Sequence, residues 1–270
     1  MSAPLITIST KSHISFCLHL ADNSLIMGHR LSEWTGHGPM LEQDIALTNI
    51  ALDLIGQARN FYQYAATISN SFARSFLTEG DNFPASEDSL AYLRSADEFK
   101  NILLAELPNG DWAKTILKLF FFSTYQYFLY ERLAHSSDKQ IAAIAQKSLK
   151  EVTYHLRWSS EWVIRLGDGT EESHVRLQKA MNELWRYTSE MFVASDYEIE
   201  CTETNIGVDV TSLKPYWDIK MKEVLDEAAI SLPMEKDLRT GGKNGNHTEH
   251  LTRILAEMQY LQRTYPGCEW

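Results

Sequence analysis

Several features that mark common protein classes are scarce in this sequence. Only three cysteines occur in 270 residues, Cys17, Cys201 and Cys268, and there is no Cys-x-x-Cys pair. This number and spacing fit neither a disulfide framework nor a zinc site, so we expect free thiols in a reducing compartment. Convincing runs of alternating apolar and polar residues are also missing, which argues against a β-sheet.

Long apolar runs and excess positive charge are missing as well. The most apolar window, residues 116–130, is interrupted by polar residues such as Lys118 and Gln126, so it predicts a core helix and no membrane span. No basic region precedes an apolar stretch at the N-terminus, so no signal peptide is predicted. The formal net charge of -11 opposes binding to nucleic acid or to an anionic membrane. We therefore expect a soluble, cytoplasmic protein without either partner.

Most of the sequence shows helical periodicity. In residues 40–66, side chains recur every three or four positions along one row: Ile45, Thr48, Leu52, Ile55, Arg59 and Tyr62. A second apolar row lies close beside it: Ile50, Leu54, Ala58, Phe61 and Ala65. About eight helices are predicted in all, near residues 13–35, 40–66, 87–106, 112–136, 139–166, 171–194, 212–230 and 248–264. We expect one all-α domain over residues 1–270, with a flexible extension over residues 1–12 and a loop over residues 198–210.

Capping signals mark several helix starts. Asp111, Thr170 and Thr248 are predicted N-caps, because each precedes a helical pattern and carries an oxygen that accepts a backbone N–H. Residues 241–245, Gly-Gly-Lys-Asn-Gly, form a break ahead of Thr248. Exposed amides in such a loop can bind an anion at a helix start, although the sequence does not match the P-loop pattern. An ordinary helix entry is the simpler interpretation.

The pair of Glu-x-x-His motifs that a dinuclear metal site in a helical bundle requires is missing. One literal occurrence, Glu171 to His174, lies in a predicted first helical turn. Glu151 and His155 are four residues apart and share a helix face. The sequence therefore predicts a structural polar core without metal, made of Asp53, Gln57, Glu151 and His155.

Two interpretations of this polar core stay open. Asp53 is either a metal ligand or a buried acid paired with an arginine. A metal site would need a histidine three residues after Asp53, and that position is Gly56. Glu151 and His155 are either ligands or an internal hydrogen-bonded pair. A working metal site of unusual spacing would need Asp53, Glu131, Glu151 and His155 to converge.

Aromatic residues surround the helix predicted over residues 112–136 on more than one side. They are Phe120, Phe121, Phe122, Tyr125, Tyr127, Phe128 and Tyr130. A helix that is apolar nearly all round is buried, either in the core or under a partner subunit. We interpret this pattern as a prediction of a large helix-mediated interface.

Several long segments resemble the C-subunit family of phenylacetyl-CoA epoxidases, in one order from about residue 16 to Trp270. They are Arg30-Leu-x-Glu33-Trp34-x-Gly36-His37, Asn49-Ile-x-Leu-Asp53-Leu-x-Gly56-Gln57-Ala58-Arg59-Asn60-Phe61, Glu106-x-Pro108-Asn109-Gly110, Lys150-Glu151-x-x-Tyr154-His155-Leu156-Arg157, Thr240-Gly241-Gly242-Lys243-x-Gly245-x-His247-Thr248-Glu249-His250-Leu251 and Ala256-Glu257-Met258-Gln259-Tyr260-Leu261-Gln262-Arg263.

The resemblance implies a ferritin-like helical bundle whose core site is degenerate, with no cofactor in this chain. It implies a complex that uses oxygen and NADPH-derived electrons to epoxidise the aromatic ring of phenylacetyl-CoA. A sister subunit of similar fold would hold the di-iron centre, and further small and reductase subunits would complete the assembly. This chain would support the catalytic subunit. The rivals are an active di-metal oxidase and a free-standing helical binding protein.

The resemblance also implies two places where the chain approaches the CoA substrate. One is a helix start made of Glu98, Phe99, Lys100 and Asn101, of which Phe99 and Asn101 fit the family pattern. The other is Ile199, Glu200 and Cys201, of which only Ile199 fits. Lys100 would meet a CoA phosphate as a point charge, while Glu98 and Glu200 would oppose it. Two ordinary surface segments are the alternative.

Overall fold

The computed structural model describes residues 8–74, 84–234, 237–265 and 268, and this part of the chain contains helices but no β-strand. The α-helices are α1 (Thr10–Ser32), α2 (Leu41–Arg74), α3 (Glu87–Tyr92), α4 (Leu103–Glu106), α5 (Trp112–Leu133), α6 (Lys139–Gly167), α7 (Glu171–Leu184), α8 (Asp196–Glu203), α9 (Lys214–Glu227), α10 (Glu249–Met258) and α11 (Tyr260–Thr264). Short 3₁₀ turns are η1 (Ala96–Glu98), η2 (Trp185–Tyr187), η3 (Ser189–Phe192), η4 (Val210–Leu213) and η5 (Gly242–Asn244). The all-α class is confirmed. Within the described ranges, no helix combines the length and apolar character needed to cross a membrane.

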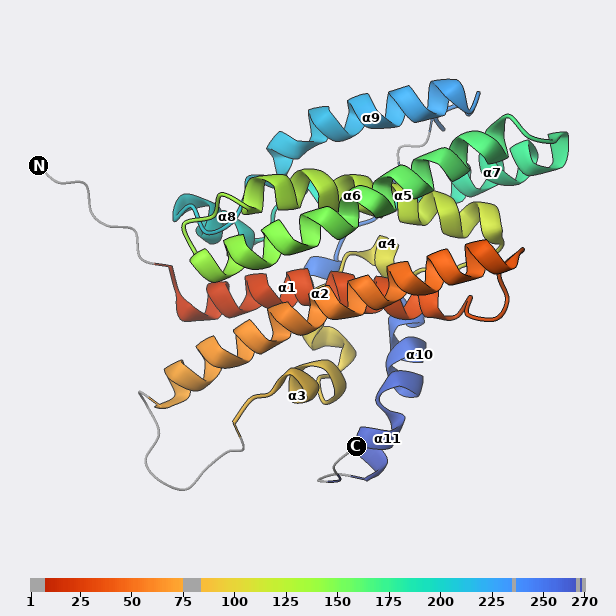
Figure 1. Cartoon of the computed structure of the whole chain (residues 1–270). Helices are drawn as coiled ribbons and strands as arrows, with labels where there is room; N and C mark the ends of the chain where they lie inside the picture. The colour runs from red at the N-terminus through yellow and green to blue at the C-terminus, as the bar shows by residue number, and fades with distance from the viewer. Residues whose placement is uncertain (1–7, 75–83, 235–236, 266–267, 269–270) are drawn as a thin grey trace, which may run out of the picture.

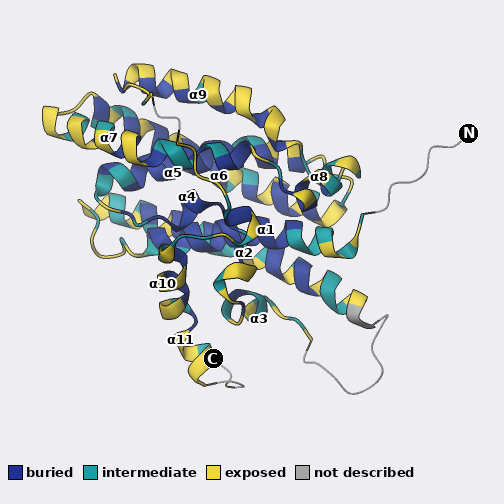
Figure 2. Ribbon diagram, turned by 180° about the vertical axis from the view of Figure 1, so that it is seen from behind, coloured by how far each residue is buried: buried dark blue, intermediate teal, exposed yellow. Residues whose placement is uncertain are grey.

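Two helical hairpins form the centre of the protein (Figure 1). The α1–α2 hairpin is one layer and the α5–α6 hairpin is the next, with α4 between them. Helix α9 lies on the outer side of the α5–α6 layer. Helices α3, α10 and α11 project from the outer side of the α1–α2 layer, and the view from behind shows the same order (Figure 2). Buried apolar side chains from Phe16 to Leu255 form one continuous core.

The aromatic helix α5 is buried by the chain itself. Phe120, Phe121 and Phe122 are fully buried, and only Tyr127 and Phe128 among the predicted aromatics are half-buried. Trp217 of α9 packs against the Phe121 ring at 5.7 Å and donates its indole N–H to the Phe121 carbonyl at 3.1 Å. The prediction that this helix forms a large partner interface is therefore wrong, because neighbouring helices of the same chain cover it.

Three predicted boundaries are also wrong. The helix predicted over residues 87–106 is interrupted, because Ser95 and Glu98 form a capping box that starts η1 and the chain then runs extended to α4. The loop predicted over residues 198–210 begins inside α8, which a second capping box at Ser195 starts. The helix predicted over residues 171–194 ends at Leu184 and continues as 3₁₀ turns.

The two chain ends also depart from their expected boundaries. Helix α1 begins at Thr10, inside the expected flexible extension, and residues 1–7 lie outside the described ranges. The helix predicted over residues 248–264 breaks at Gln259, whose side-chain amide donates to the carbonyls of Ala91 and Arg94 at 3.3 and 2.9 Å.

The predicted N-caps are confirmed. The side chain of Asp111 accepts from the Lys114 amide at 3.0 Å, that of Thr170 from the Ser173 amide at 3.1 Å, and that of Thr248 from the His250 amide at 3.2 Å. Each bond satisfies one of the backbone donors that a helix start leaves free, so these positions set where α5, α7 and α10 begin.

Close packing at the end of α6 leads to a stability prediction. A Cβ added at Gly167 would lie 2.2 Å from the carbonyl oxygen of Ala228 and 2.7 Å from its Cβ. Gly167→Ala should therefore lower the free energy of unfolding by about 1–3 kcal/mol, measured by urea denaturation. Gly56→Ala is the control, because a Cβ there meets nothing within 4 Å. It should raise the free energy of unfolding by about 0.5–1 kcal/mol; equal effects of the two changes would contradict this packing.

Candidate functional site

Residues 99–109, which include α4, run through the interior between η1 and α5; we call them the buried connector. Fully buried residues in it are Phe99, Asn101, Ile102, Leu104, Ala105 and Glu106. Backbone N–H and C=O groups shielded from water need hydrogen-bond partners, and the short helix α4 with the extended residues on either side of it satisfies few of its own. Side chains from other elements must therefore supply them.

Helix α1 supplies several of these partners from one face. Asp22 accepts from the Lys100 amide at 2.8 Å, and Asn23 accepts from the Ile102 amide at 2.8 Å. Arg30 donates through Nε and Nη2 to the Glu106 carbonyl at 3.0 and 2.9 Å. The positions 22, 23 and 30 fall on one side of a helix, so this face of α1 holds the connector along its length.

Asp22 is itself held by buried donors. It accepts hydrogen bonds from the guanidinium group of Arg94 and from the hydroxyl of Tyr62. Asp22 is fully buried and Arg94 is 8% exposed, and the Arg94 Cζ lies 4.1 Å from the centre of the Phe99 ring. A buried ion pair is tolerated when hydrogen bonds complete both charges, as here.

His19 extends the same face of α1 as a neutral residue. Its Nδ1 lies 2.7 Å from the Lys100 carbonyl oxygen, which can only accept, so Nδ1 carries the proton. Its Nε2 then accepts from the Asn23 side-chain amide at 3.2 Å. Burial lowers the pKa of His19, and the Glu198 carboxylate at 3.6 Å only partly offsets this. The hydrogen bonds and the pKa agree on an uncharged ring.

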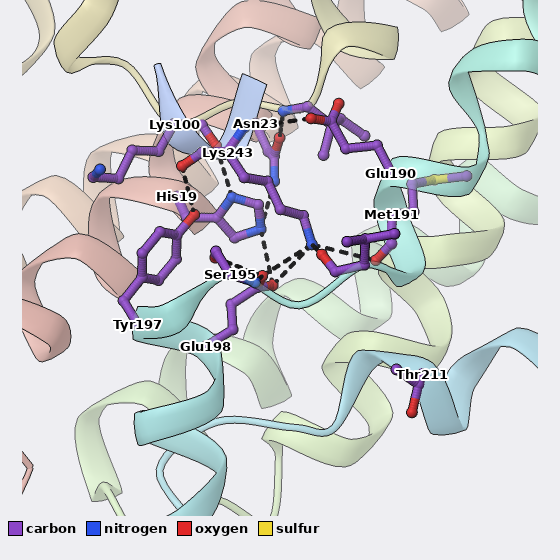
Figure 3. A network of polar contacts seen from close by, with 12 residues as sticks. His19, Asn23, Lys100, Glu190, Met191, Ser195, Tyr197, Glu198, Thr211 and Lys243 are labelled. Carbon is purple, nitrogen blue, oxygen red and sulfur yellow. Dashed lines mark hydrogen bonds and ion pairs between the residues drawn. The ribbon is translucent and has the colours of Figure 1, made fainter. Parts of the chain in front are cut away.

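Lys243 and Glu198 form a buried ion pair beside His19 (Figure 3). The Lys243 ammonium is 3.0 Å from both carboxylate oxygens of Glu198 and 3.0 Å from the Val193 carbonyl. Burial acts to raise the pKa of Glu198, but the Lys243 charge together with the nearby hydrogen-bond donors brings the pKa below its usual value. The lysine of the Gly-rich loop therefore points into the protein.

The Gly-rich loop binds a carboxylate of its own chain. Glu190 accepts from the Gly241 amide at 2.7 Å and from the Leu103 amide at 2.6 Å, while burial raises its pKa. A Cβ at Gly242 would lie 2.3 Å from the Asn101 carbonyl oxygen, so the loop packs directly on the connector. The Gly241 amide is thus already donated to Glu190, and the structure favours an internal role over the phosphate interpretation.

His247, which follows this loop, is a charged residue. Its Nδ1 lies 2.7 Å from a Glu106 carboxylate oxygen and its Nε2 lies 2.9 Å from the Phe99 carbonyl oxygen. Both partners are acceptors, so both ring nitrogens carry protons. Burial acts to lower the pKa of His247, but the hydrogen bond and charge of Glu106 raise it above the usual value. Interior sites of the same bundle therefore hold one neutral and one charged histidine.

The structure brings the two predicted substrate segments together at α1. The Lys100 ammonium lies 5.2 Å from the centre of the Tyr197 ring, and His19 lies between the Lys100 carbonyl and Glu198. Phe99, Asn101 and Cys201 are buried, whereas Glu98 and Ile199 are exposed and Lys100 and Glu200 are half-buried. The first segment is not a helix start, because η1 ends at Glu98, and the second lies within α8.

Glu98 and Glu200 have structural partners. Glu98 accepts from the Ser95 amide at 2.8 Å and caps η1. Glu200 accepts from the backbone amide of Ser9 and from the hydroxyl of Ser12, so it fastens the start of α1 to α8. These bonds fix the positions of both acids within the chain. Burial lowers the pKa of Lys100 itself.

The predicted polar core lies between α2 and α6. Its hydrogen-bonded pairs differ from the predicted ones, which were Asp53 with an arginine and Glu151 with His155. His155 Nε2 is 3.0 Å from Asp53 Oδ2, and the Gln57 amide donates to Glu151 at 2.9 Å. Asp53 is therefore paired with a histidine and not an arginine, and Glu151 and His155 bond across to α2 instead of to each other. Gln57 Oε1 also accepts from the Tyr130 hydroxyl at 3.4 Å.

These residues do not fit a di-iron centre. Among the described residues, no three or more His, Cys, Asp or Glu side chains are grouped so that they could hold a metal ion. His155 is fully buried, the Asp53 side chain is 39% exposed, and Glu131 lies exposed on α5. Asp53, Glu131, Glu151 and His155 therefore do not form the site that the di-metal alternative requires.

Sequence reasoning missed the polar face of α1 and the acids that complete it. His19, Asp22, Asn23 and Arg30 recur at helical spacing among the apolar residues of α1, which was a usable signal. Glu190 and Glu198 gave no such signal, because they belong to short turns and a short helix whose positions depend on the tertiary structure.

Comparison with known proteins covers nearly the whole chain. Residues 3–270 match the family model described as "Phenylacetic acid catabolic protein". A curated relative, the C subunit of the 1,2-phenylacetyl-CoA epoxidase of Escherichia coli (strain K12), is 46% identical over 256 residues. These cover 95% of this chain and 98% of the relative. The family match includes every residue of the polar clusters described above.

The two interior histidines should give opposite pH dependences of stability. The pKa of His247 is raised on folding, so its contribution is complete below about pH 6.5 and is lost as pH rises through the folded pKa. The pKa of His19 is lowered, so its contribution is present above about pH 6.5 and is lost as pH falls toward the folded pKa. The loss of unfolding free energy caused by His247→Gln should thus shrink with rising pH, and that caused by His19→Gln should grow. Parallel trends in urea unfolding would contradict the two protonation states.

Proposed function

We propose that this chain, which belongs to the phenylacetic acid catabolic protein family, is the C subunit of a 1,2-phenylacetyl-CoA epoxidase. In this function it takes part in phenylacetate catabolism as one subunit of a multicomponent oxygenase that epoxidises the aromatic ring of the CoA ester. The observation that carries the proposal is 46% identity to the C subunit of such an enzyme over 95% of this chain.

Within that complex, the proposed role of this chain is structural support of the catalytic subunit. A ferritin-like di-iron site needs about six protein ligands that converge from four helices. Here Gly56 stands three residues after Asp53, and Asp53 and Glu151 are held by His155 and Gln57. The di-iron centre is therefore assigned to the partner catalytic subunit, with small and reductase subunits completing the complex. Cys17, Cys201 and Cys268 are free thiols, which supports the proposed cytoplasmic location.

The second part of the proposal places a CoA phosphate at Lys100. The buried members of the predicted set, Phe99, Asn101 and Cys201, hold their segments in position. The half-buried Lys100 ammonium lies over Tyr197, and the charges that act on it are those of Asp22, Arg94 and Lys11. A phosphate that reached Lys100 would gain a charge-assisted contact, which the acids of the predicted set, Glu98 and Glu200, would oppose.

The structural role predicts the metal content of the subunits. The chain purified alone should carry no stoichiometric iron, because the possible ligands Asp53, Glu151 and His155 already form hydrogen bonds within the chain. Without this chain, the catalytic subunit should become insoluble or inactive. The first expectation is measured by quantifying iron in each separated subunit. The second is measured by the turnover of the catalytic subunit with and without this chain. Two irons per chain here, or a fully active catalytic subunit alone, would contradict the role.

The placement of Lys100 predicts a binding effect. Lys100→Met in the complete complex should raise KM for phenylacetyl-CoA by roughly 3–10-fold with little change in kcat, because it removes uniform binding of a phosphate. Lys147→Met, an exposed lysine on α6, is the matched control and should leave KM unchanged. An unchanged KM for Lys100→Met would contradict the proposed contact between this chain and the substrate. It would not contradict the proposed structural role.

A further inference from the structure

The C-terminal helices form an arm that the rest of the protein covers only in part. Residues 247–265, which include α10 and α11, project from the α1–α2 layer (Figure 1 and Figure 2), and we call them the C-terminal arm. Helix α10 buries Leu251, Ile254 and Leu255, whereas none of the described residues of α11 is buried. A cleft of about 390 Å³ lies between the end of α1 and α10. A segment with few buried apolar contacts opens at a lower free energy than the rest of its protein.

The start of this arm is fastened to the buried connector through one carboxylate and one carbonyl. Glu106 is fully buried and accepts from the backbone amide of Thr248 and from Nδ1 of His247, both at 2.7 Å. Asn101 of the connector donates to the same carboxylate at 2.9 Å. Nε2 of His247 donates to the Phe99 carbonyl at 2.9 Å. The first two residues of the arm therefore hold the connector at Phe99 and at Glu106.

This attachment requires a proton on each nitrogen of the His247 ring. The side chain is 3% exposed, so water has little access to replace a lost hydrogen bond. A neutral imidazole carries a proton on one nitrogen, and its other nitrogen is an acceptor. Loss of one proton would therefore set a bare nitrogen against the Glu106 carboxylate or the Phe99 carbonyl, which are both acceptors. A buried acceptor that loses its donor is destabilising, so the closed position of the arm would be weakened.

We propose that His247, Glu106 and the Phe99 carbonyl form a pH-sensitive latch, which holds the C-terminal arm closed while the ring is doubly protonated and lets it open, without global unfolding, when the ring loses a proton. Burial acts to lower the pKa of His247, but the hydrogen bond and charge of Glu106 raise it above the usual value. The closed arm therefore binds the proton more tightly than the open arm. The latch is complete below about pH 6.5 and weakens as pH rises through the pKa of the closed state.

Other ionisable groups lie near this latch. Asp22 of α1 acts together with Glu106 to raise the pKa of His247. Burial lowers the pKa of His250, the next histidine of the arm, so its ring is already neutral above about pH 6.5. Burial also lowers the pKa of Lys100 in the connector. His250 and Lys100 are therefore the groups that control variants must remove. Further charged residues on the surrounding elements are Arg30 of α1, Asp97 and Glu98 of η1, Lys243 of η5, and Glu249 and Arg253 of α10.

Hydrogen exchange of the full chain at several pH values tests the latch. Between about pH 6 and about pH 8.5, the protection of α10 amides, corrected for the intrinsic exchange rate, should fall at least about threefold relative to that of α9 amides. Release of one proton limits this change to about tenfold per pH unit. Helix α9 is the internal reference, because it contains no histidine and packs on α5 through Trp217.

Three variants separate the latch from other effects of pH. His247→Gln has no titrating ring, so its α10 protection should be low already at about pH 6 and should not change with pH relative to α9. His250→Gln and Lys100→Met should keep the wild-type response. Protection of α9 shows in each sample that the rest of the chain is folded, and the wild-type pH series is decisive even if a variant fails to fold. Equal changes in α9 and α10 of the wild-type chain would overturn the latch, as would a pH response that persists in His247→Gln or disappears in His250→Gln.

Discussion

The structure depends on satisfying the backbone of the buried connector. Each N–H or C=O group left unpaired in the interior would cost about 1–3 kcal/mol, and several such groups lie in this mostly extended segment. The partners come from distant parts of the chain: Asp22 from α1, Glu190 after α7, and His247 after the Gly-rich loop. Lys118 of α5 donates to the Leu107 carbonyl at 2.7 Å although burial lowers its pKa well below the usual value. The connector therefore ties both hairpins and the C-terminal segments into one unit.

This network gives the polar and glycine-rich motifs of the sequence hydrogen-bond and charge partners within the chain. Lys243 and Glu198 neutralise each other, Glu106 neutralises His247, and Glu190 accepts backbone amides. Breaking one buried charge pair typically costs about 3–5 kcal/mol, because the remaining charge stays in the interior. The chain's proposed contribution to the oxygenase is accordingly a rigid support whose function lies at its surfaces.

The long helices and their caps could be predicted from sequence, because periodicity and capping are local: Asp111, Thr170 and Thr248 start helices as expected. The polar core residues of α2 and α6 were also identified, but their pairing depended on how two helices pack, so His155 meets Asp53 and not Glu151. The connector was missed since its extended conformation is imposed by side chains far away in sequence. Aromatic richness showed that α5 is buried but gave no means to tell the chain's own core from a partner.

The central claim is that the polar groups between α2 and α6 support the fold and perform no chemistry. The double change Asp53→Asn and Glu151→Gln tests it most directly, because both substitutions keep the side-chain shape while removing the carboxylates. The measurement is turnover of phenylacetyl-CoA per assembled complex, with assembly quantified on the same sample. The account predicts turnover equal to that of the wild-type complex. Loss of turnover in a complex that assembles fully would contradict it and would place a reacting group in this subunit.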